Sequence, residues 1–254
     1  MARTLWTGVA SGKREAGALG ESERFSLVEH LEELRRRLIV ITAVLAATGG
    51  AAYYFTPSIL ARLMAGQKAI EELVFLSPAE AFFTRMKLAF AVGFVASLPV
   101  MLWQIWAFVA PALDRRTKVF SFLLIPVSSL LFAAGAFFAY VGVLPFALRF
   151  FLGFSSAELQ PLITVGNFVS FATFLILPFG IVFELPVVVF FLSRLGLVGP
   201  RFLSRNRKFA ILGIFTMAAL LTPGPDVFSQ MMMAVPMVIL YEISILIARL
   251  VSPR

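Results

Sequence analysis

The densest run of side chains able to do chemistry lies directly before the first long apolar segment of the chain. The segment HLEELRRRL (30–38) holds Glu32, Glu33 and three adjacent arginines. In a helix each glutamate would pair with the arginines three and four residues later, contributing only about 0.2–0.5 kcal/mol per exposed pair. A second interpretation stays open. A carboxylate here would receive an arginine from another chain, in a bidentate geometry that distinguishes arginine from lysine.

The composition narrows the class of protein and the chemistry. The 254-residue chain is 60% hydrophobic and 14% charged, far more apolar than a soluble globular chain. It has no cysteine and a single histidine, His30, so we expect no metal centre, thiol nucleophile or other cofactor. Phosphate-loop, HExxH and GxSxG motifs are absent from the sequence, so we expect no enzymatic activity. The net charge of +8 is typical of the flanks of membrane helices, and no nucleic-acid partner is expected.

The apolar segments predict an all-α membrane protein with six transmembrane helices. About 20 helical residues cross roughly 30 Å of hydrocarbon. The expected spans cover about residues 38–55, 88–110, 119–148, 165–193, 209–222 and 227–247. The polar residues 1–25 predict a disordered cytoplasmic tail without a cleavable signal peptide, and residues 251–254 a second short tail.

The basic residues predict the orientation in the membrane. Of the 22 lysines and arginines, 17 lie before the first span, in 115–118, in 194–208 or at the carboxyl end. Because lysine and arginine concentrate in cytoplasmic segments, both termini should be cytoplasmic. The last two spans are short: Phe209 to Thr222 would measure only about 21 Å. Six prolines inside the spans predict bent helices and a curved wall, at Pro99, Pro126, Pro145, Pro178, Pro186 and Pro236.

Five motifs, taken together and in order, resemble the TatC family, the large polytopic subunit of the twin-arginine protein translocase. They are HLEELRRRL (30–38), SPAEAFFTRMKLA (77–89), PxxxxQxWxFVAPAL (99–113), FELP (183–186) and TPGPDVFSQ (222–230). The resemblance covers the chain from Ser26 to Leu250. It implies a multi-pass protein of the cytoplasmic membrane that binds twin-arginine signal peptides of folded precursors and uses the proton-motive force. It also implies single-span TatA/TatB-type partner subunits and homo-oligomers within the receptor complex.

The resemblance assigns the signal-peptide site to particular residues. The glutamate of the HLxELR motif is Glu33, and Glu32 is auxiliary to it. A second family acid, in the loop after the second span, is replaced here by Thr117. Asp114 either supplies the missing charge or only caps the third helix, whose start suits an aspartate. Phe108, Pro111 and Leu113 either line the apolar part of the pocket or pack ordinarily.

Two further polar sites stand out in the apolar segments. Glu184 lies about 15 Å along the helix from Arg194, where a carboxyl group is costly unless it is neutral, paired or facing water. It is either hydrogen-bonded to a neighbouring helix or exposed on the concave face where cargo or a partner passes. The resemblance implies that polar residues of TPGPDVFSQ contact the single-span partner subunits. The candidates for this contact are Thr222, Asp226 and Gln230. Asp226 also suits the cap of the last helix.

Two other classes of protein would require residues of a different kind. A secondary transporter of a small solute would require paired broken helices around a midplane site, and the sequence offers one deep acid, Glu184. An intramembrane enzyme would require a nucleophile with its base, or metal ligands. The transporter remains the alternative hypothesis.

Overall fold

Every regular element in the part of the chain that the structure describes is a helix. The computed structural model describes residues 7–67, 73–109, 115–154, 162–221 and 227–251, and side chains are described within residues 28–67, 73–108, 123–154, 162–220, 227 and 230–251. The elements are α1 (Thr7–Ala65), α2 (Pro78–Val109), α3 (Arg115–Phe138), a π-helix η2 (Ala139–Val143), α4 (Leu144–Leu152), α5 (Val165–Phe183), α6 (Leu185–Arg194), α7 (Pro200–Arg205), α8 (Arg207–Leu221) and α9 (Val227–Val251).

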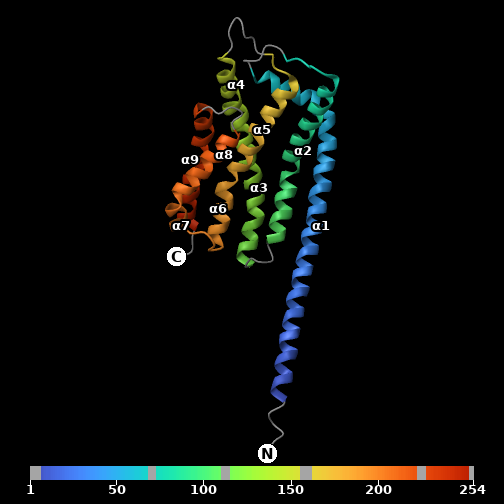
Figure 1. The fold of residues 1–254 in the computed structure, drawn as a ribbon, viewed down its shortest axis with the longest axis vertical. Coiled ribbons are helices and arrows are strands. Elements are labelled where there is room, and N and C mark those ends of the chain that lie inside the picture. The colour runs from blue at the N-terminus through green and yellow to red at the C-terminus, as the bar shows by residue number, and fades with distance from the viewer. Residues whose placement is uncertain (1–6, 68–72, 110–114, 155–161, 222–226, 252–254) are drawn as a thin grey trace, which may run out of the picture.

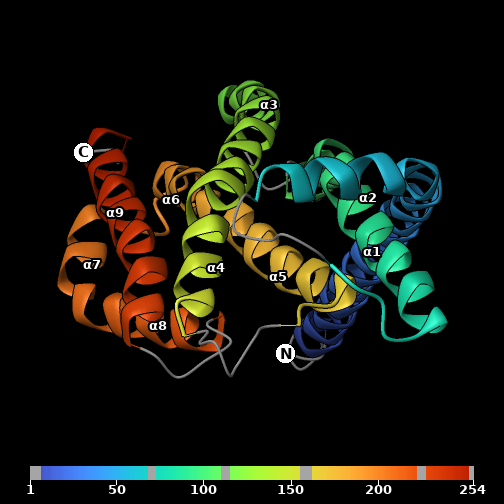
Figure 2. The same cartoon turned by 90° about the horizontal axis from the view of Figure 1, so that it is seen from above.

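Helix α1 is longer than the sequence predicted. It begins at Thr7, whereas residues 1–25 were expected to be disordered. No proline interrupts the chain before Pro57, so every residue of this stretch has a backbone N–H to donate within the helix. Figure 1 shows the amino-terminal half of α1 extending alone beyond the other helices. Near Pro57 the helix bends, and its last turns lie across the top of the bundle in Figure 2, where Tyr140 donates a hydrogen bond to the Arg62 carbonyl (3.0 Å).

The remaining helices form a wall that starts from α1. Helix α1 packs along α2, α2 on α5, α5 on α3, and α6 on α9. Glycine residues allow the backbones of α1 and α2 to approach each other closely. A Cβ at Gly93 of α2 would lie 2.5 Å from the Cα of Gly49 of α1, and Thr48 donates a hydrogen bond to the Gly93 carbonyl (2.9 Å). Such small-residue contacts are the usual way in which membrane helices associate.

Two of the predicted spans are each divided between two helices. The span expected at 165–193 breaks at Glu184, between α5 and α6, where Pro186 is the second residue of α6. Because Pro186 has no N–H, it cannot donate to Val182, and the Glu184 N–H bonds the Ile181 carbonyl (3.0 Å). The span expected at 119–148 passes through the π-helix η2, which ends two residues before Pro145. Irregular helix geometry therefore accompanies Pro186 and Pro145, two of the six prolines.

Among the described residues, five helical stretches are long and apolar enough to cross a membrane. They are Val28–Ala65, Pro78–Phe108, Leu123–Leu152, Val165–Arg194 and Gln230–Val251. The expected fifth span corresponds to α8, whose 15 residues measure about 22 Å. The all-helical membrane fold is therefore confirmed, and the count of six spans stays a prediction.

At the opposite end from the amino-terminal half of α1, a carboxylate joins two connections of the chain. Glu80, in the first turn of α2, accepts hydrogen bonds from the Leu76 N–H and the Gly166 N–H, both 2.9 Å. The same connections pair in a short parallel bridge between Val74 and Thr164. We call these contacts the Glu80 clip. It fastens the start of α2 to the start of α5.

Candidate functional site

Three residues of the motif HLEELRRRL share one face of α1. His30, Glu33 and Arg37 are spaced three and four residues apart, so they lie one above another on the helix. Arg37 forms an ion pair with Glu33, contacting Oε1 through Nε at 3.1 Å and through Nη2. The predicted pairing of Glu33 with Arg37 is therefore confirmed. Glu32, by contrast, is exposed.

The same face of α1 contacts the end of α2. Arg37 Nη1 donates to the side-chain oxygen of Gln104 (3.2 Å) and to its backbone oxygen (3.4 Å), and Nη2 donates to the Ala107 carbonyl (3.1 Å). The His30 ring stacks on Phe108, with ring centroids 4.4 Å apart. The arrangement places a half-buried carboxylate beside an aromatic surface, where water competes less with a charged partner.

The loop residues predicted for the same site fall outside the described part of the chain. Pro111, Leu113 and Asp114 lie in 110–114, and the side chain of Thr117 is not described either. The connection they belong to leaves α2 one residue after Phe108 and enters α3 at Arg115. Their roles stay predictions.

Glu184 lies at the break between α5 and α6 and is half-buried. Its carboxyl group lies near the hydroxyl of Ser128, a buried residue of α3. Its Oε1 atom is buried and has no hydrogen-bond partner among the described residues. Both interpretations of Glu184, a hydrogen bond to a neighbouring helix and a place on the face where cargo or a partner passes, stay predictions.

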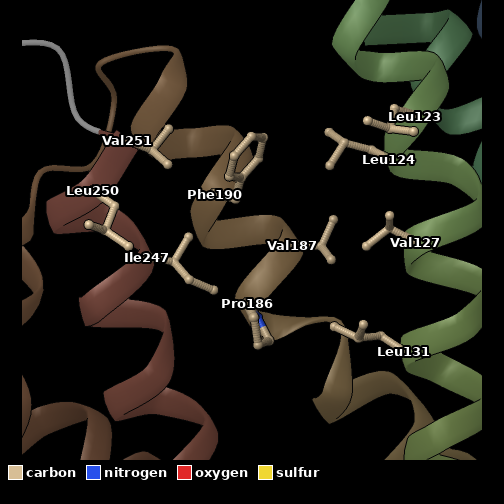
Figure 3. A pocket seen from close by; sticks show the side chains of 10 residues that line it. All are labelled: Leu123, Leu124, Val127, Leu131, Pro186, Val187, Phe190, Ile247, Leu250 and Val251. Atoms are coloured by element: carbon tan, nitrogen blue, oxygen red, sulfur yellow. The ribbon is translucent and has the colours of Figure 1, made fainter.

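An apolar groove of about 460 Å³ starts beside this break. Figure 3 shows Val187 of α6 pointing toward Val127 of α3, with Ile247 of α9 on the other side of α6. Glu184 is not among its lining residues. The groove therefore offers an apolar surface between three helices without a carboxylate.

Gln230, predicted to bond a partner across a helix contact, has a partner within the chain. Its Nε2 donates to the Phe215 carbonyl of α8 (2.9 Å), so the amide ties α9 to the short α8. The predicted partner residues Thr222 and Asp226 lie outside the described residues. Asp226 precedes the first residue of α9, Val227.

Sequence reasoning missed several residues that the structure brings into these contacts. Gln104 was part of a quoted motif, but neither it nor Ala107 received a role, because their partners lie about 70 positions away in the sequence. Glu242 was likewise left unassigned. It forms an ion pair with Arg207 at 2.7 Å, which joins the start of α8 to α9.

The fold and this clustering define a class: a multi-span α-helical membrane protein with a charged site at one end of its first two apolar helices. Residues 29–236 match the family model described as Sec-independent protein translocase protein (TatC). The chain belongs to the TatC family, and the resemblance stated from the motifs is confirmed.

The chain is similar to TatC proteins, and to a solved TatC structure, along nearly its whole length. The chain is 43% identical to the Sec-independent protein translocase protein TatC of Carboxydothermus hydrogenoformans, over 92% of this chain and 97% of that protein. For TatC of Aquifex aeolicus the identity is 40%, over 90% and 96%. A crystal structure of the twin-arginine translocase receptor TatC superposes with a TM-score of 0.78 at 40% identity, covering 87% of this chain and 99% of that one. The family is one of protein translocases, so the alternative of a small-solute transporter is wrong.

Proposed function

We propose that this chain is the twin-arginine signal-peptide receptor and core subunit of a translocase that exports folded proteins. Three things support the proposal: the family, the proteins it resembles, and the half-buried Glu33 on the face that α1 presents to the end of α2. Glu33 carries it. Its side chain is 35% exposed, so another chain can reach it while the surrounding helices exclude part of the water.

The proposal includes the setting of the site. The chain would lie in the cytoplasmic membrane with both termini cytoplasmic, and the basic residues 194–208 would lie at the same inner surface. Figure 1 supports this arrangement, because the first turn of α3, the end of α6, helix α7 and the end of α9 lie together toward the amino-terminal half of α1. The proton-motive force would drive transport, and the chain would be a translocase component without enzymatic activity.

Partner subunits belong to the proposal as well. Single-span TatA/TatB-type subunits would dock near Thr222, Asp226 and Gln230, and several copies of this chain would assemble in the receptor complex. Because the Gln230 amide already bonds Phe215, a partner there would contact a surface that α8 and α9 form together.

Removing the charge of Glu33 tests the proposal. Glu33→Gln keeps the size of the side chain but loses a charge-assisted pair, usually worth about 1.5–3 kcal/mol, so affinity for a twin-arginine peptide should fall roughly ten- to hundredfold. The measurement is binding of synthetic peptides carrying Arg-Arg or Lys-Lys to the purified protein. Glu32→Gln, one residue away and exposed, is the matched control and should bind almost as the parent does. Equal preference for Arg-Arg in Glu33→Gln and in the parent would refute the assignment.

A further inference from the structure

Arg37 is held at the site from two sides. On α1 it pairs with Glu33, and on α2 it donates to the side chain and backbone of Gln104 and to the Ala107 carbonyl. Its side chain is only 20% exposed. The neighbouring Arg35 and Arg36 are exposed, so the burial belongs to this position and not to the basic run as a whole.

The hydrogen bonds that Arg37 makes with α2 do not involve Glu33. Ala107 lies among the last four residues of α2, whose carbonyls have no partner within the helix. A cation at a helix carboxyl end is also favoured by the helix dipole. If Glu33 turned toward another charge, Arg37 would still have three oxygen atoms as acceptors.

The pair engages only one side of the carboxylate. Both Nε and Nη2 of Arg37 contact the same atom, Oε1 of Glu33, and Oε2 takes no part in the pair. A carboxylate has about four acceptor positions, so Glu33 keeps capacity for a second guanidinium. Bidentate pairing with arginine depends on the orientation of the carboxylate, whereas a lysine ammonium acts as a point charge.

We propose that Arg37 is a positioning residue: held by the end of α2, it fixes the Glu33 carboxylate in the orientation that favours an incoming arginine over a lysine. This inference rests on the proposed function, because it assigns to Arg37 the selectivity of the same site. Arg37 acts through Glu33 and not as a ligand of the peptide.

The test compares Arg37→Lys with Arg36→Lys in the purified full chain; Arg36 is the exposed neighbour of Arg37. Lysine keeps the charge, but its compact ammonium lacks the planar guanidinium geometry that contacts Glu33, Gln104 and Ala107 at once. Affinity for the Arg-Arg peptide should fall roughly tenfold in Arg37→Lys. The Lys-Lys peptide should bind almost unchanged, so the ratio between the two peptides collapses. Arg36→Lys should keep the parent ratio.

Two additional variants make the test decisive. In a Glu33→Gln background, Arg37→Lys should cause no further loss, because the residue acts through that carboxylate. Gln104→Leu keeps Arg37 but removes one of its acceptors, so it should lower the ratio partly even if Arg37→Lys folds poorly.

Failure of this inference differs from failure of the proposed function. An unchanged peptide ratio, or additive losses with Glu33→Gln, would overturn the role of Arg37 while leaving Glu33 as the site. Tighter binding in Arg37→Lys would also overturn it and show Arg37 to be a competitor for Glu33. No effect of Glu33→Gln itself would remove both proposals.

Discussion

At the scale of single residues, the face of α1 on which a glutamate lies decides whether it packs against α2 or is solvated. Glu32 and Glu33 are neighbours with the same chemistry, yet Glu33 faces the end of α2 and Glu32 is exposed. The difference follows from the helical period, which puts Glu33 in line with His30 and Arg37. A substitution at one of the two glutamates is therefore the natural control for the other.

The first prediction concerns the loop after the second span, where Thr117 replaces the second acid of the family. If Asp114 supplies the charge that Thr117 does not, Asp114→Asn should weaken binding of the Arg-Arg peptide roughly tenfold. Asparagine caps a helix about as well as aspartate, so the thermal stability of the protein should not change. Adding Thr117→Glu should restore the affinity, because position 117 lies about one turn along α3.

Peptide binding and thermal unfolding of the same purified variants check this prediction. Unchanged binding in Asp114→Asn would leave Asp114 as a helix cap alone, and failure of Thr117→Glu to rescue a loss would place the required charge elsewhere.

The candidate site was predicted from the sequence only as far as local patterns reach. The pairing of Glu33 with Arg37 follows from four-residue spacing and was expected. The assignment of Glu33 to the signal-peptide site rests on the motif and stays a prediction. The contacts of Arg37 with Gln104 and Ala107 depend on how α1 packs against α2, and a single sequence does not record that packing.

At the scale of elements, the prolines alone did not predict which helices are interrupted. Pro99, Pro126, Pro178 and Pro236 lie within continuous helices, whereas Pro186 accompanies a one-residue interruption at Glu184. The outcome depends on which groups satisfy the freed backbone atoms, and those groups come from other parts of the chain. The same limit explains why SPAEAFFTRMKLA was recognised as a motif while the clip made by its Glu80 was not anticipated.

The second prediction concerns the Glu80 clip. The two carboxylate oxygens accept from two different N–H groups, Oε1 from Gly166 and Oε2 from Leu76. Glutamine has one acceptor oxygen, so Glu80→Gln leaves at least one of these donors without its partner in the clip. The melting temperature in detergent should fall, and amide hydrogen exchange at Leu76 and Gly166 should accelerate.

Glu32→Gln is the matched control for this prediction, since the same change on the exposed face of α1 breaks no contact of the clip. Equal melting temperatures for the two variants would mean that the Val74–Thr164 bridge joins the two connections without help from Glu80.

At the scale of the whole molecule, the number of membrane crossings depends on α8. With 15 residues it falls about 8 Å short of roughly 30 Å of hydrocarbon, and apolarity alone does not show whether the membrane thins around it. Two contacts hold α8 against the longer α9: Gln230 bonds Phe215, and Arg207 pairs with Glu242. A short helix sheltered in this way can cross where an isolated one would not.

The last prediction tests this crossing directly. The chain has no cysteine, so single cysteines report accessibility without background. Arg201→Cys and Val227→Cys flank α8 at exposed positions, and Ser77→Cys marks the end of the bundle that carries the Glu80 clip. If α8 crosses the membrane and the termini are cytoplasmic, a membrane-impermeant maleimide applied to intact spheroplasts should label Val227→Cys and Ser77→Cys. Arg201→Cys should react only after the membrane is permeabilised. Labelling of Val227→Cys and Arg201→Cys from the same side would show that α8 returns without crossing. The chain would then have five spans, and its two termini would lie on opposite sides of the membrane.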